Sequence, residues 1–202
     1  LAPGLRQKLL ACQGEEAQTL TEQTRRFLDF QESIRRTYWR TLIITALLLS
    51  LLVLAISEAG RHIEWLRDTW LGGKSNLATA VSFNVAAVLV ACLVVRRTPE
   101  AQGSGYPEMK AMLFGHFMES FLSLKVLASK AVALALVASS GMPIGQEGPN
   151  VHMAACITKC LDKQFFAEHV GNPIVTHMLL AACAVGVGAT FSAPVGGVLL
   201  AL

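Results

Sequence analysis

Two long stretches of this chain, 42–56 and 77–95, contain no charged residue. Both are rich in Leu, Ile, Val and Ala, and with their flanks both reach about the 20 residues that a helix needs to cross a bilayer. Because the bilayer core holds no water to pair backbone groups, such stretches must be helical. The chain is also 53% hydrophobic and only 15% charged, unlike an ordinary soluble domain. We therefore predict an all-α integral membrane protein with several spans.

Charged residues concentrate outside these two stretches. Residues 1–36 are polar and predict a cytosolic N-terminal arm, with at most one short amphipathic helix, while residues 37–202 form the transmembrane region. Residues 57–76, with Trp65 and Trp70, predict a connection at the membrane interface. Arginines before the first span and after the second place both ends of this hairpin in the cytosol. A net charge of +3, with no basic cluster among aromatics, argues against a nucleic-acid partner.

The later apolar stretches are shorter or interrupted. They are expected at 109–121, 126–139 and 151–157, followed by the Gly- and Ala-rich region 176–202, which Pro194 should divide into two helices. Short, broken helices at membrane depth line polar pathways. The small residues of the last region predict close packing against other helices.

Two similar segments begin these broken helices. Residues 103–108 read Gly-Ser-Gly-Tyr-Pro-Glu and residues 145–149 read Gly-Gln-Glu-Gly-Pro. Glycine allows a tight turn and close approach to the backbone, and proline suits the first turn of a helix. The unpaired N–H groups and the dipole at a helix start attract anions. The pair of segments therefore predicts an anion site inside the membrane.

Three side chains could act at such a site. The Ser104 hydroxyl could donate to an anion, or it could simply cap the following helix. Glu147 could occupy the anion site when ionised and leave it when protonated, or it could only complement the helix dipole at the surface. Lys130 lies within an apolar stretch, where it could attract anions or extend its ammonium to the membrane interface.

Metal binding and catalysis have little support in the sequence. His152, Cys156 and Cys160 lie at i, i+4 and i+8 on one helical face, but three ligands without a fourth favour simple packing over a metal site. Five cysteines, mostly in apolar stretches, predict no disulfide framework. No phosphate-binding loop, nucleophile elbow or zinc-protease motif is present, so we expect neither an enzyme nor a cofactor.

The two segments resemble family motifs when taken together. Residues 103–107 are similar to the GSGIP motif, and residues 145–149 to the G(K/R)EGP motif, of the CLC chloride channels and chloride/proton exchangers. Residues 191–197, Phe-Ser-Ala-Pro-Val-Gly-Gly, are similar to the FNAPLAG-type segment of the same family. The resemblance covers residues 37–202 and implies the first of two inverted halves, with tilted and broken transmembrane helices.

The resemblance also implies roles for individual residues. Ser104 and Gly105 would hold the central anion, and the amides of Gln146, Glu147 and Gly148 would form the outer anion site. Glu147 would be the protonatable gate. Lys130 would supply positive potential near the pore.

The ligands implied by the resemblance are chloride and protons. The mode would be channel conduction or chloride/proton exchange, in the plasma membrane or an endomembrane. Region 176–202 would join two copies into a homodimer.

Two features depart from the family pattern. Gln146 stands where the family usually has Lys or Arg, so a positive charge near the outer site is missing. The chain also ends before the internal acidic residue, the later GxFxP segment and the late tyrosine of the family. The alternative to a transporter is therefore a truncated, non-transporting membrane subunit or interaction protein.

Overall fold

The computed structural model describes residues 3–70, 77–161, 163 and 173–201. Within these ranges every regular element is a helix, which confirms the all-α prediction. The elements are α1 (Pro3–Trp70), α2 (Leu77–Arg96), the 3₁₀ helix η2 (Pro99–Ala101), α3 (Tyr106–Leu113), α4 (Leu124–Ser139), α5 (Glu147–Leu161), α7 (Pro173–Phe191) and α8 (Pro194–Ala201). The chain divides into two compact units, Leu1–Arg40 and Thr41–Leu202. The predicted boundary after residue 36 and the cytosolic location of the arm stay predictions.

Three described helical segments are long and apolar enough to cross a membrane. They are Arg35–Thr69, Leu77–Arg96 and Ile174–Phe191. The first two contain the charge-free stretches 42–56 and 77–95, so the predicted spans are confirmed as helices. Helix α2 ends at Arg96, where the basic residue lies favourably in the last turn.

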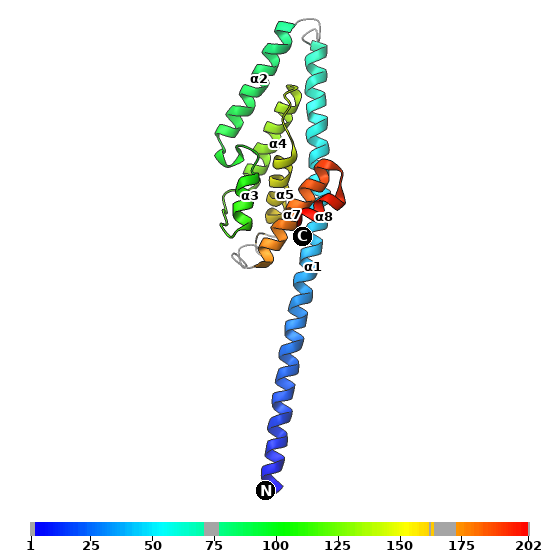
Figure 1. Ribbon diagram of the computed structural model, residues 1–202, viewed down its shortest axis with the longest axis vertical. Coiled ribbons are helices and arrows are strands. Elements are labelled where there is room, and N and C mark those ends of the chain that lie inside the picture. Colours follow the sequence, from blue (N-terminus) through cyan, green and yellow to red (C-terminus); the bar gives the residue numbers. More distant parts are fainter. Residues whose placement is uncertain (1–2, 71–76, 162, 164–172, 202) are drawn as a thin grey trace. The chain divides into compact units, whose positions relative to one another are not determined.

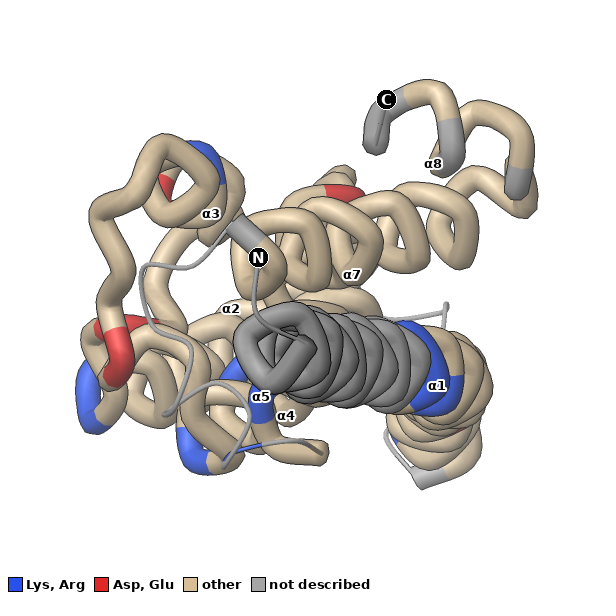
Figure 2. Tube along the Cα trace, turned by 90° about the horizontal axis from the view of Figure 1, so that it is seen from below, with Lys and Arg blue, Asp and Glu red and all other residues tan. Residues whose placement is uncertain are grey.

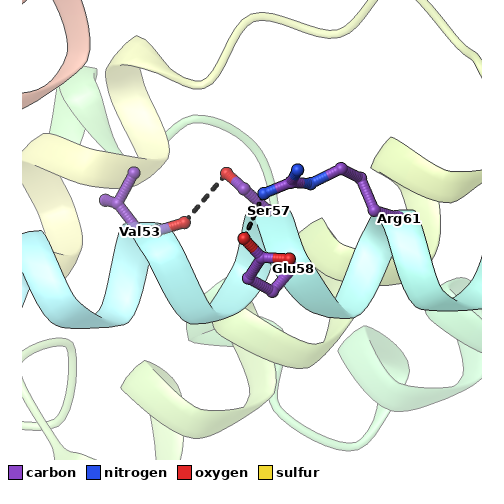
Figure 3. A network of polar contacts seen from close by, with 4 residues as sticks. All are labelled: Val53, Ser57, Glu58 and Arg61. Atoms are coloured by element: carbon purple, nitrogen blue, oxygen red, sulfur yellow. Dashed lines mark hydrogen bonds and ion pairs between the residues drawn. The ribbon is translucent and has the colours of Figure 1, made fainter.

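Helix α1 is longer than predicted in both directions. It continues without interruption from residue 3 to residue 70, where a short helix and then an interface connection were expected. Figure 3 shows how the polar residues after the apolar stretch are accommodated: the Ser57 hydroxyl donates to the Val53 carbonyl at 2.9 Å, and Arg61 pairs with Glu58 one turn away. Because these groups find partners within the helix, they do not end it. Residues 71–76 lie outside the described residues.

The broken helices are present with different bounds. Helix α3 ends at Leu113 rather than near residue 121, because Gly115 adopts a φ of 100° that a helix cannot continue. Helix α4 begins at Leu124, two residues before the predicted start, and is capped by Ser123, whose side chain accepts from the Val126 N–H at 3.3 Å. Helix α5 covers 147–161 instead of 151–157, so Glu147 is its first residue.

The core of the second unit lies where α1, α4 and α5 meet. Leu49 of α1 and Met153 of α5 are fully buried, and Leu134 of α4 packs into the same cluster. A buried hydrogen bond of 3.1 Å joins the hydroxyls of Thr45 and Thr158 across α1 and α5. Further packing joins α2 to α4, α5 to α7, and α7 to α8, and Figure 1 shows α2 and α4 side by side. This cluster fixes the helix α5 that begins with the second Gly-rich segment.

The final helices confirm two predictions about the region 176–202. Helix α7 ends at Phe191, a turn with Ser192 at a φ of 51° follows, and α8 begins at Pro194. Neither helix contains Lys, Arg, Asp or Glu, so their described parts appear tan in Figure 2. Gly186 lies so close to α5 that an added Cβ would be 2.6 Å from the Val151 Cα. The small residues of α7 therefore do allow close helix packing.

Substitution of Gly186 by Ala should destabilise the protein. The new methyl group would meet backbone atoms of α5, which cannot move as a flexible side chain could, so we expect a loss of about 1–3 kcal/mol. A lowered melting temperature of the detergent-solubilised protein would show it. Gly60→Ala is the matched control, since its Cβ would find only ordinary contacts at 3.8 Å. Equal melting temperatures for the two variants would contradict the packing described here.

Candidate functional site

The two Gly-rich segments meet in space. Gly148, in the first turn of α5, lies against the turn that precedes α3, and a Cβ added there would be 2.5 Å from the Cβ of Ser104 and 3.2 Å from its carbonyl oxygen. Only a residue without a side chain allows this approach. Two segments that are far apart in the sequence are thereby brought to one place.

The first segment forms a tight turn that presents Ser104. Gly105 has a left-handed backbone with a φ of 80° and occupies the N-cap of α3, and Pro107 lies in the first helical turn. The Ser104 Oγ accepts a hydrogen bond of 3.3 Å from the Tyr106 N–H. A hydroxyl that accepts in this way still has its own proton to donate. The capping interpretation and the anion-binding interpretation of Ser104 are therefore compatible.

The second segment forms the partly exposed start of α5. Glu147 is the first residue of the helix and is exposed, whereas Gln146 and Gly148 are half-buried. The first helical hydrogen bond runs from the Asn150 N–H to the Gln146 carbonyl at 3.0 Å. The N–H groups before it have no acceptor within the helix, and Pro149 has none to offer. Free amide donors thus gather where the sequence predicts the outer anion site.

Lys130 of α4 lies next to the first segment. Its side chain is only 4% exposed, and its ammonium donates to the Ser104 carbonyl at 3.3 Å and contacts His152 Nδ1 at 2.7 Å. Among the described residues no carboxylate forms an ion pair with it. The ammonium therefore stays inside the protein, and extension to the membrane interface does not describe its position.

His152 of α5 is fully buried and uses both ring nitrogens. An ammonium can only donate, so Nδ1 accepts from Lys130 and Nε2 carries the proton. That N–H donates to the Phe121 carbonyl at 3.0 Å, and the ring stacks on the Phe121 ring with centroids 3.9 Å apart. Cys156, one turn further, places its thiol 3.8 Å from the same carbonyl. Across the described part of the chain, no three His, Cys, Asp or Glu side chains group as metal ligands.

A cavity of about 790 Å³ opens beside Ser104 and Lys130. Apolar residues of α2 and α4 form much of its wall, and Arg96 adds a second cation. Gly145 and Pro149 of the second segment also line it, but Glu147 does not. Thus Ser104, Lys130 and Gly148 are close together, while Glu147 is exposed and does not line this cavity.

The partnership of Lys130 with His152 was not foreseen from the sequence. Sequence spacing groups His152 only with Cys156 and Cys160, on its own helix. A lysine inside an apolar helix does signal that some polar partner must exist. Nothing in the spacing of 22 residues indicates that His152 is that partner.

Comparisons with known proteins identify the family of this chain. The family described as "Voltage gated chloride channel" matches residues 86–202, which is more than half of the chain. The chain belongs to the voltage-gated chloride channel family. Like its members it is an integral, multi-pass membrane protein.

Individual relatives cover different parts of the chain. Chloride channel protein 2 of Drosophila melanogaster is 39% identical over 165 residues, or 79% of this chain. Chloride channel protein 2 of Homo sapiens is 45% identical over 107 residues, or 52% of this chain. The chain spans only 14% and 12% of the length of these two relatives.

A solved structure shares the fold. The crystal structure of a eukaryotic CLC transporter matches with a TM-score of 0.69 and 32% identity. The match covers 82% of this chain and 33% of that one. The predicted CLC-type arrangement of helices is thereby confirmed.

Two glycines of the first segment should respond differently to substitution. Gly103 and Gly105 both have positive φ, at 67° and 80°, so Ala strains the backbone at either position. At Gly105 the new Cβ would also lie 2.7 Å from His152 Nδ1, whereas at Gly103 nothing lies within 4 Å. We expect Gly105→Ala to be less stable than Gly103→Ala by about 1–3 kcal/mol. Thermal melting of both variants tests this, and an equal loss would show that His152 does not press on the turn.

Proposed function

We propose that this chain is part of an anion transport protein that moves chloride across a membrane. The observation that carries the proposal is the contact between Gly148 and Ser104, because it joins two helix starts into one site. Membership of the voltage-gated chloride channel family supports chloride as the anion. The relatives are named as channels and a transporter, and we propose neither an enzymatic activity nor a cofactor.

In this proposal Ser104 and Gly105 hold the central anion. The Ser104 Oγ already accepts from the Tyr106 N–H, so its proton is the group that donates to chloride. The start of α3 adds the positive end of its dipole at the same place. The cavity that Ser104 lines provides the space for the ion.

The start of α5 forms the outer anion site, with Glu147 as its gate. Amides at Gln146, Glu147 and Gly148 lie at or before the first turn, where acceptors within the helix are lacking. The exposed Glu147 carboxylate can reach amides of its own helix start and compete with an anion there. Protonation removes that attraction, so the gate opens when Glu147 takes up a proton. Gln146 adds no charge of its own, which leaves the amides as the attracting groups.

Lys130 supplies the positive charge of the site. A buried ammonium is costly unless it is well hydrogen-bonded and its charge is balanced. Its two described partners, Ser104 O and His152 Nδ1, are both neutral acceptors. A bound anion would therefore balance a charge that the described residues leave without an ion pair.

The apolar surface of the last two helices supports a dimer. Phe191, Val195 and Leu199 are 56%, 72% and 67% exposed. We propose that region 176–202 contacts a second copy of the protein. Such contact would cover these side chains.

Substitution of Glu147 by Gln tests the gate. Gln cannot ionise, so it should keep the outer site open, and the anion current at neutral pH should match the larger current of the unmodified protein at acidic pH. The current should also stop depending on pH. The measurement is the chloride current of the protein expressed from its complete gene. An unchanged current with unchanged pH dependence would remove Glu147 as the gate.

A proton gradient separates the two modes of transport. An exchanger's reversal potential shifts with the pH difference across the membrane, whereas a channel's potential follows chloride alone. Absence of any current from well-folded protein would favour a non-transporting subunit instead.

The contact between the segments can be tested within one motif. Gly148→Ala should push α5 away from Ser104 and reduce the chloride current at least severalfold, because the added Cβ clashes at 2.5 Å. Gly145→Ala is its control, since nothing lies within 4 Å of the Cβ it would gain. Equal currents from both variants would mean that the contact is not needed for transport.

A further inference from the structure

We propose that His152 is a positioning residue that holds the Lys130 ammonium against the Ser104 turn while remaining neutral itself. The inference rests on the proposed function, since it concerns the charge that attracts the anion. It adds a residue of α5 that no sequence motif pointed to. Its basis is a connected set of contacts between three separate parts of the chain.

The Lys130 ammonium is held in place by two contacts. A lysine side chain has many rotamers and no fixed direction of its own. Lys130 is fixed by two contacts, to His152 Nδ1 at 2.7 Å and to the Ser104 carbonyl at 3.3 Å. The shorter contact is to His152, so the imidazole is the main restraint on the ammonium. The third N–H donor of Lys130 is left for an anion.

The imidazole of His152 differs from a carboxylate in being a neutral acceptor for the Lys130 ammonium. A carboxylate in place of His152 would neutralise the ammonium and leave an anion nothing to balance. A neutral ring nitrogen holds the ammonium without cancelling its charge. Glu108 of α3 is close enough to interact electrostatically with Lys130 but forms no ion pair with it among the described residues. The ammonium therefore lies beside Ser104 with no carboxylate in direct contact with it among the described residues.

The His152 ring is itself held by contacts on both of its nitrogens. Its Nε2–H is bound to the Phe121 carbonyl at 3.0 Å, and its ring stacks nearly parallel to the Phe121 ring, at 9°. Gly105, which has no side chain, allows the backbone of the turn to approach Nδ1 closely. With Nε2 already donating, Nδ1 can only accept. The ring is thus fixed both in place and in protonation.

The two nitrogens can be tested separately. In His152→Asn the amide oxygen occupies nearly the position of Nδ1, so the acceptor for Lys130 is kept and the bond to Phe121 is lost. In His152→Gln the amide reaches the position of Nε2, so the bond to Phe121 is kept and the acceptor for Lys130 is lost. If His152 acts through Lys130, chloride current should stay near normal in the Asn variant. It should fall on the order of tenfold in the Gln variant, the size expected for loss of a charged hydrogen bond.

If His152 had a purely structural role, the two variants would rank in the opposite order. If the bond to Phe121 is what matters, the Asn variant should lose both current and melting temperature while the Gln variant keeps both. That result would overturn the proposal. Met153→Leu, a neighbouring and fully buried position of α5, is the control for general repacking and should leave the current unchanged.

A double-mutant cycle with Lys130→Met separates a failure of this inference from a failure of the proposed function. Lys130→Met should itself lower the current; if it does not, the proposed role of Lys130 fails, whatever His152 does. In the Lys130→Met background, His152→Gln should cause no further loss if the two act together, and an added full loss would overturn the proposal. Should His152→Gln carry too little current to measure, the same four variants with melting temperature as the readout give the coupling of the pair. No coupling would then count against the proposal.

Discussion

The close backbone contact between the start of α5 and the turn before α3 organises the candidate site. Gly148 rests on Ser104, and His152, one turn further along α5, rests on Gly105. Two helix starts that are separate in the sequence thereby share one small volume. In the function we propose, the amides of the helix starts and the buried ammonium attract the anion, and both are positioned by that contact.

Packing elsewhere keeps the contact in place. The buried cluster of Leu49, Leu134 and Met153 fixes α5 against α1 and α4. On its other side, Gly186 allows α7 to approach the Val151 backbone. Helix α5 is therefore held on several sides, and its first turn has little freedom to leave the Ser104 turn. A rigid scaffold of this kind lets a few polar groups keep a fixed geometry in an apolar surrounding.

The positions of Lys130 and Glu147 set the distribution of charge at the candidate site. An ammonium in this setting would normally be expected beside a carboxylate. Lys130 instead has neutral acceptors, and the ionisable Glu147 lies exposed at the start of α5 rather than beside it. In the function we propose, the buried positive charge attracts the anion and the exposed carboxylate gates it. This separation of charges links the fold to the function we propose.

Sequence alone predicts the helical membrane fold, because charge-free runs such as 42–56 can pair their backbone groups only as helices. It also marked Ser104 and Glu147, since glycine and proline have fixed effects on the local backbone. Helix ends were less predictable: α1 continues through Ser57 and Glu58 because their side chains find partners within the helix. The contact between Lys130 and His152 follows only from the way α4 packs against α5. Contacts between residues on different helices depend on how those helices pack, and no local spacing carries that information.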